Sequence, residues 1–111
     1  MRKEYNKLVR DRIPEIIRES GRECAVEVMS DSEYREALWQ KLVEEAAEGR
    51  DASREIPEGI VTELADLYEV IDAIMVAHGI QQETVLEEQE RKRLKRGGFE
   101  ARLRLLWASD S

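Results

Sequence analysis

The sequence predicts an all-α fold. Charged residues make up 39% of the 111 residues, and there are only two prolines and six glycines, while Thr and aromatic residues are few. This composition favours long helices over strands, which prefer β-branched and aromatic residues. Apolar residues also recur at helical spacing within 31–49 and 57–78. The length suits one modest core, so we expect a single domain over residues 1–111, with a polar tail at about 108–111.

Start and stop signals place the first two helices. A short helix is expected over residues 12–20, with Pro14 in its first turn and Gly21 at its end. The alternating stretch CAVEVM at 24–29 favours a short extended segment. Ser30 and Glu33 have the spacing of a capping box, which predicts a second helix over about 31–49 that ends at Gly49.

Two further helices follow the loop RDASREIP. Pro57 suits the first turn of a third helix, which ends at Gly79. A fourth helix, over roughly 81–96, is almost entirely polar and ends at Gly97 and Gly98. The remaining residues contain an apolar patch around Leu103, Leu105, Leu106 and Trp107.

Charge and hydropathy exclude several classes of partner. Of the 25 acidic residues, 21 lie within 13–90, whereas 12 of the 18 basic residues lie within 1–12 and 91–104. A protein that binds duplex nucleic acid usually has a continuous basic face, so the pI near 4.9 argues against a nucleic acid polymer. The longest apolar run, AIMVA at 73–77, is too short for a membrane span.

The first dozen residues are too charged for a signal peptide, and the single cysteine cannot form an internal disulfide. Both features indicate a cytoplasmic protein. Cys24 has no histidine partner in a recognisable nucleophile motif, so we expect it to be a small buried side chain.

Acidic side chains occupy the apolar faces of both long helices. On a helical wheel, Glu45 lies within the stripe of the second helix and Glu48 at its edge, whereas Glu44 faces solvent. The third helix repeats this pattern with Glu63 inside its stripe and Asp66 at its edge. The apolar stripes comprise Tyr34, Leu38, Trp39, Leu42 and Ala46, and Leu64, Leu67, Val70, Ile71 and Ile74. Since a short loop joins the helices, we expect antiparallel neighbours that point both acidic pairs into one interior.

Four carboxylates at a shared apolar interface require positive charge between them, because burying one bare charge costs several kcal/mol. Mg²⁺ takes oxygen ligands, keeps some water and is often completed by substrate phosphates. We therefore interpret Glu45, Glu48, Glu63 and Asp66 as ligands of Mg²⁺, which Mn²⁺ could replace. The alternative is that these carboxylates pair with the basic C-terminal segment and specify assembly.

Two internal motifs and both ends of the chain resemble a known family. EEAAE at 44–48 followed by ELAD at 63–66 is similar to the E-x-x-E, spacer, E-x-x-D signature of the all-α nucleoside triphosphate pyrophosphohydrolases, the MazG-like superfamily. YNKLVRDRIPEII at 5–17 and KRGGFEARL at 95–103 resemble the opening and closing motifs of its compact phosphoribosyl-ATP pyrophosphohydrolase-like branch. The resemblance covers residues 5–103.

The resemblance implies a four-helix MazG-like bundle that assembles as a homodimer or homotetramer. It also implies Mg²⁺-dependent cleavage of the α–β bond of a (deoxy)nucleoside triphosphate to a monophosphate and pyrophosphate, in nucleotide-pool cleaning. Its metal ligands match the same four carboxylates. The alternatives are phosphoribosyl-ATP hydrolysis in histidine biosynthesis and a non-enzymatic helical assembly module. The short loop between the acidic pairs leaves little protein there for recognising a base.

Candidate catalytic residues follow from the same motifs. Glu45 or Glu48 would act as the general base for water. Lys41, one helical turn before Glu45, either completes the catalytic site or forms a plain salt bridge to Glu45. His78 falls at the end of the third helix, where the favourable interaction with the helix terminus is explanation enough, and we assign it no catalytic role.

Basic residues near both ends are candidates for phosphate binding. The resemblance implies that the opening motif contributes Lys7, Arg10 and Asp11 to the active site. Before Gly97, the basic side chains either bring positive charge to phosphate or are solvated charges at a helix end; they are Lys92, Lys95 and Arg96.

Overall fold

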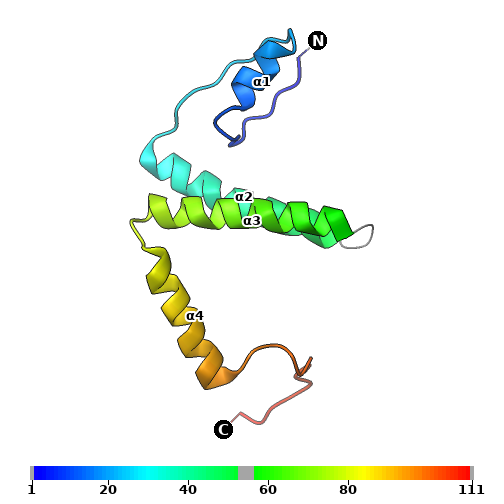
Figure 1. Ribbon diagram of the computed structural model, residues 1–111, viewed down its shortest axis with the longest axis vertical. Coiled ribbons are helices and arrows are strands. Elements are labelled where there is room, and N and C mark those ends of the chain that lie inside the picture. Colours follow the sequence, from blue (N-terminus) through cyan, green and yellow to red (C-terminus); the bar gives the residue numbers. More distant parts are fainter. Residues whose placement is uncertain (1, 53–56, 111) are drawn as a thin grey trace. The chain divides into compact units, whose positions relative to one another are not determined.

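The computed structural model describes residues 2–52 and 57–110. It contains α1 (Ile13–Glu19), α2 (Asp31–Ala52), α3 (Pro57–Ala77) and α4 (Gln82–Arg96), and no strand occurs among the described residues (Figure 1). The predicted all-α class is confirmed, and each expected helix is present. The stretch 24–29 is irregular rather than part of a strand. Among the described helices, none is long and apolar enough to cross a membrane.

The chain divides into two compact units, Met1–Gly79 and Ile80–Ser111. The first unit contains α1, α2 and α3, and the second contains α4 and the residues after it. The expectation of one domain over the whole chain stays a prediction.

Helix α1 begins and ends as its sequence predicts. Pro14 lies in the first turn, where a missing N–H costs no helical hydrogen bond. The amide of Gly21 donates to the carbonyl of Arg18 at 3.0 Å, and Gly21 has φ 84°, a left-handed conformation that glycine adopts without steric strain. Positive φ angles also occur at Gly79 and Gly97, which follow α3 and α4 as expected.

The predicted capping box opens α2. The amide of Ser30 donates to Glu33 Oε1 at 3.1 Å, and the amide of Glu33 donates to Ser30 Oγ at 3.3 Å. Two backbone donors that the helix cannot satisfy thus gain partners. The predicted end at Gly49 is wrong, because α2 continues to Ala52. Of the predicted loop that follows, residues 53–56 lie outside the described part of the chain.

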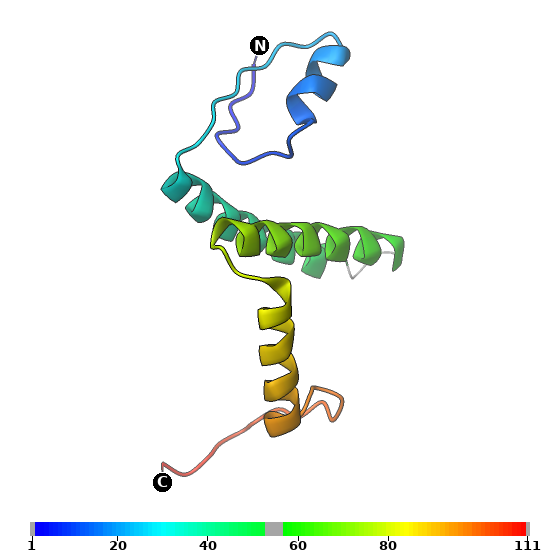
Figure 2. The ribbon, with the colours of Figure 1, turned by 60° about the vertical axis from the view of Figure 1, so that its left-hand side comes forward.

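Helices α2 and α3 pack side by side and run antiparallel, as predicted (Figures 1 and 2). Their small core consists of Leu38, Val70 and Ile74, with exposed fractions of 3%, 7% and 8%. Partly buried apolar residues pack against it, among them Leu8, Tyr34, Leu42, Ala73 and Ala77. The core therefore lies between the first half of α2 and the last half of α3, and Leu8 of the N-terminal segment packs against it.

Several residues of the predicted stripes are not covered. Leu64 is 52% exposed, Ile71 is 39% exposed and Trp39 is 49% exposed, and Ala46 is also exposed. Tyr68 is 71% exposed, whereas Met75 is buried. The prediction of one wide buried face is therefore wrong for these positions: the hairpin covers a narrower stripe, and a second apolar surface stays open on α3.

In the second unit, α4 is polar and has no buried residue. Arg91 pairs with Glu88 one turn earlier, and Arg93 pairs with Glu100 beyond the end of the helix. The apolar residues of the predicted C-terminal patch, Leu103, Leu105, Leu106 and Trp107, are exposed. This unit has little apolar interior of its own.

Candidate metal centre

Three carboxylates from two helices converge at the α2–α3 interface. Glu45, Glu48 and Glu63 can each place one oxygen so that all three atoms lie within 4.8 Å of one another. Glu45 and Glu48 are three residues apart on α2, a spacing that puts them on one side of the helix. Glu63 reaches the same point from α3 because the helices are packed neighbours. We call Glu45, Glu48 and Glu63 the acidic cluster.

Two oxygens of the acidic cluster are buried without a hydrogen-bond partner, Glu45 Oε2 and Glu63 Oε2. Glu45 is 7% exposed, whereas Glu63 is half-buried and Glu48 is exposed. An unsatisfied carboxylate oxygen in the interior is costly unless it binds a cation or a proton. The donor set is oxygen only, which suits a hard divalent cation, and the exposed Glu48 leaves a side open to solvent. The residues therefore fit a divalent metal.

The electrostatics of Glu63 point the same way. Burial, a hydrogen bond to the Glu45 carboxyl group and the charges of Glu45, Glu48 and Asp66 all raise the pKa of Glu63. Each cause reflects the same problem, which is negative charge brought together in a partly dry interface. A bound cation would neutralise this negative charge and so favour the ionised form of Glu63.

Lys41 supplies part of the counter-charge. Its Nζ lies 3.5 Å from Glu45 Oε1, and the two side chains are 23% and 9% exposed. The salt bridge that the spacing suggested is therefore present. It engages only one oxygen of Glu45 and leaves Oε2 without a partner.

Asp66, the fourth predicted ligand, pairs with a basic side chain, and its role as a metal ligand stays a prediction. Arg10 Nη2 donates to Asp66 Oδ1 at 2.7 Å. Leu8, two residues before Arg10, packs against the core and so holds the N-terminal segment on the hairpin. The sequence pointed to Arg10 only through the opening motif. Nothing in its local pattern predicted a contact with a residue 56 positions away.

Gly49 has a role that the sequence analysis missed. A Cβ atom placed on Gly49 would lie 3.4 Å from the Cβ of Glu63. This glycine therefore marks a close approach of α2 to α3 beside the acidic cluster, and not a helix end. The sequence did contain one signal for this role, because Gly49 directly follows Glu48, a candidate metal ligand.

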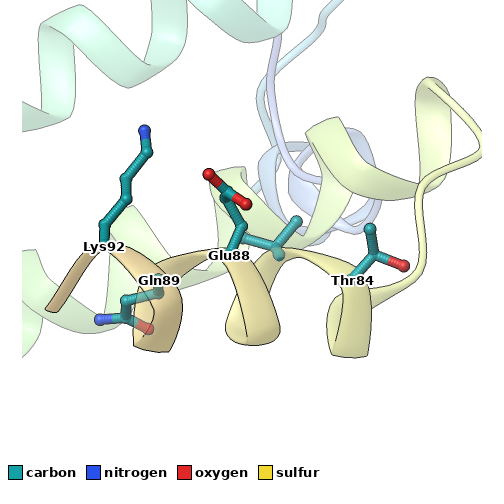
Figure 3. Close-up of a pocket in the computed structure, with 5 residues that line it drawn as sticks. Thr84, Glu88, Gln89 and Lys92 are labelled. Carbon is teal, nitrogen blue, oxygen red and sulfur yellow. The ribbon is translucent and has the colours of Figure 1, made fainter. Parts of the chain in front are cut away.

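The other predicted site residues are exposed. Lys7 and Asp11 lie in the N-terminal segment, and Lys92, Lys95 and Arg96 lie on α4. Figure 3 shows Lys92 and Glu88 extending from α4 beside a shallow hollow that Thr84 and Gln89 also line. The hollow is formed by one surface of a single helix and contains none of the clustered carboxylates.

His78 and Cys24 have structural contacts. Trp39 Nε1 donates to His78 Nε2 at 3.4 Å, which links α2 to the end of α3. Cys24 is half-buried, and its Sγ lies 3.8 Å from the carbonyl oxygen of Pro14. Cys24 is thus less buried than predicted.

Comparison with protein families identifies the family to which the chain belongs. The profile of the family described as phosphoribosyl-ATP pyrophosphohydrolase matches residues 2–93. This chain belongs to that family. The match includes α1, α2 and α3, all three residues of the acidic cluster and most of α4. The resemblance to MazG-like pyrophosphohydrolases is thereby confirmed.

A curated protein of Mycolicibacterium smegmatis (strain ATCC 700084 / mc(2)155), described as an uncharacterized protein, is 60% identical over 45 residues. The aligned part covers 40% of this chain and 46% of that protein, so the match spans about half of the relative's length. No solved structure matches the chain.

Proposed function

We propose that this pyrophosphohydrolase uses Mg²⁺ to cleave the α–β bond of a (deoxy)nucleoside triphosphate, yielding a monophosphate and pyrophosphate. The observation that supports this most strongly is the acidic cluster, with three carboxylates within 4.8 Å and two buried oxygens that lack partners. Mn²⁺ has the same preference for oxygen ligands and would be a working substitute.

Glu45, Glu48 and Glu63 would hold the cation. A divalent cation at this point neutralises phosphate charge and lowers the pKa of a bound water. The carboxylates of the cluster fix its position because α2 and α3 are packed against each other, and Lys41 holds Glu45 in place. Phosphoryl transfer depends mainly on such positioning and charge neutralisation.

Glu48 is the better candidate for the general base. Glu45 is 7% exposed and contacts Lys41, whereas Glu48 is exposed at the edge of the same cluster. A base must reach both the attacking water and the solvent that carries its proton away. Replacing Glu48 with Gln should abolish turnover and leave the helical circular dichroism unchanged. Retained turnover would refute this role.

Basic residues would complete the substrate site. We propose that Arg10 and Lys7 bind phosphate in the first unit, and that Asp11 of the same segment contributes to the active site. On α4, Lys92, Lys95 and Arg96 are further candidates, since a row of exposed cations near a helix end favours phosphate. Exchanging Lys95 and Arg96 for Ala should raise KM for the triphosphate severalfold and leave Tm nearly unchanged. A lowered Tm with an unchanged KM would instead support a structural role for the two residues.

Phosphoribosyl-ATP is the second candidate substrate, because the matching family profile carries its name. Both reactions cleave the same kind of α–β phosphoanhydride bond, so the acidic cluster supports either. What distinguishes them is the group attached to the triphosphate, which the cluster does not contact.

A substrate panel tests the proposal. Ribo- and deoxynucleoside triphosphates and phosphoribosyl-ATP would be incubated with the protein in Mg²⁺ or in EDTA, and products followed by phosphorus NMR. We expect pyrophosphate and a monophosphate to form in Mg²⁺ and not in EDTA. Orthophosphate as the product would refute α–β cleavage, and no product from any substrate would favour the assembly module.

We also propose that the protein works as a homodimer or homotetramer. The second apolar surface of α3 consists of Val61, Leu64, Tyr68 and Ile71, with exposed fractions from 39% to 71%. These residues recur at intervals of three and four, which is the pattern of a helix that packs against another helix. In sedimentation experiments, the wild type should form a dimer or tetramer, and Leu64→Glu should sediment as a smaller species.

A further inference from the structure

Arg10 and Asp66 form an ion pair at the border of the acidic cluster. The donor and acceptor atoms, Arg10 Nη2 and Asp66 Oδ1, are 2.7 Å apart. Asp66 lies three residues after Glu63 on α3, close enough for its charge to act on Glu63. The guanidinium therefore neutralises a carboxylate that adjoins the three clustered ones.

The backbone near Arg10 is held while its side chain stays accessible. Leu8 packs against the core, and the amide of Ile13 donates to the carbonyl of Arg10 at 3.0 Å. The side chain of Arg10 is nevertheless 59% exposed, and that of Asp66 is 31% exposed. The guanidinium is therefore accessible to a ligand from solvent while it pairs with Asp66.

We propose that Arg10 is an exchangeable counter-charge: it neutralises Asp66 when no cation is bound, and it moves to the nucleotide's phosphates when a divalent cation binds beside Asp66. A guanidinium pairs with carboxylate and phosphate through the same N–H geometry, so the transfer replaces one charge-assisted contact by another. This inference rests on the proposed function, because it assumes that the acidic cluster binds a metal and a phosphate substrate.

The reason for the exchange is repulsion between cations. A divalent ion near Asp66 would lie within a few ångströms of the guanidinium, and like charges at that distance disfavour each other. Arg10 and the metal therefore compete for the same negative charge. A bound triphosphate removes the conflict, because it supplies new negative charge for Arg10.

A metal titration without nucleotide tests whether Arg10 competes with the metal for the charge of Asp66. Mn²⁺ binding would be measured by calorimetry for the wild type, Arg10→Ala, Arg10→Gln and Arg12→Ala. Arg12 is the matched control, since it belongs to the same segment but pairs with Glu15 at 3.1 Å. We expect Mn²⁺ to bind about threefold to tenfold more tightly to both Arg10 variants, and with unchanged affinity to Arg12→Ala. Unchanged or weaker binding to the folded Arg10 variants would overturn the inference.

A second titration tests the transfer to phosphate. With saturating Mn²⁺ present, a nucleoside triphosphate with a non-hydrolysable α,β-methylene link should bind about tenfold or more weakly to Arg10→Ala, because a charge-assisted contact is lost. Binding to Arg12→Ala should match that of the wild type. Equal affinity for the wild type and Arg10→Ala would overturn the transfer.

The two titrations separate this inference from the proposed function. Unaltered Mn²⁺ affinity in the Arg10 variants overturns the inference alone. Mn²⁺ binding without pyrophosphate release from any substrate overturns the proposed hydrolysis alone. Failure of the wild type and all variants to bind Mn²⁺ overturns both.

Discussion

Gly49 of α2 faces Glu63 of α3 so closely that a Cβ atom on the glycine would lie 3.4 Å from the Cβ of the glutamate. Such a distance is an ordinary van der Waals contact, so one methyl group fits but a longer side chain does not. The glycine therefore lies at a close approach of the two helices beside the acidic cluster. We expect the separation of the helices there to decide whether Glu63 reaches Glu45 and Glu48.

Substitutions at Gly49 should therefore separate helix stability from metal binding. Gly49→Ala should raise the free energy of unfolding by about 0.5–1 kcal/mol, because alanine favours the helix interior. Gly49→Leu should instead push α3 away and weaken Mn²⁺ binding. Urea unfolding and Mn²⁺ titration of both variants check this. Equal Mn²⁺ affinity in Gly49→Leu and the wild type would show that the close approach does not shape the cluster.

The capping box should contribute measurably to stability. Ser30→Ala removes the hydroxyl that accepts the Glu33 amide, and should lower the free energy of unfolding by about 1 kcal/mol. Ser32→Ala is the control, since Ser32 lies within the first turn of α2 and its hydroxyl contacts Ser30 Oγ at 3.5 Å but caps no backbone amide in the described hydrogen bonds. A similar loss of unfolding free energy in both variants, measured by urea unfolding, would argue against a specific contribution of the capping box to stability.

Lys41 should matter most when no metal is present. Lys41→Met leaves the nearly buried Glu45 without its cation, which should lower the free energy of unfolding by roughly 1–3 kcal/mol in EDTA. Lys41→Arg keeps the charge and should be close to the wild type. Added Mn²⁺ should narrow the difference between Lys41→Met and the wild type. A difference that metal leaves unchanged would mean that Lys41 contributes by packing alone.

The raised pKa of Glu63 predicts a specific pH dependence. In EDTA, the unfolded chain releases the Glu63 proton near the usual value of 4.5, while the folded protein keeps it to a higher pH. Because the folded state binds the extra proton, the contribution of Glu63 to the free energy of unfolding is greatest below about pH 4.5 and falls as pH rises through the raised pKa. In Glu63→Gln, the free energy of unfolding should not show this decrease with rising pH. Parallel stability curves for the two proteins would contradict the raised pKa.

The features that sequence predicted best are local or periodic. The capping box joins residues three apart, and the places of Glu45 and Glu63 within apolar stripes follow from the helical repeat. Both carboxylates indeed meet at the interface. These predictions held because one helix carries all the information that they need.

Other features depend on neighbours that a single helix does not reveal. A helical wheel gives the direction of Leu64 and Ile71 but not what covers them, and both are exposed. Gly49 carries the local signal of a helix end, yet the approach of α3 explains it better. The Arg10–Asp66 pair joins two distant segments, so periodicity within either one could not have predicted it.

In the proposed reaction, the acidic cluster holds the metal used for hydrolysis. The most direct test measures pyrophosphate release from a triphosphate for the wild type, Glu63→Gln and Glu69→Gln, in Mg²⁺ and in EDTA. Glu69 is the matched control, an exposed glutamate on the same helix. We predict release by the wild type and Glu69→Gln in Mg²⁺ only, and background levels for Glu63→Gln. Undiminished release by a folded Glu63→Gln, or release that continues in EDTA, would contradict the account.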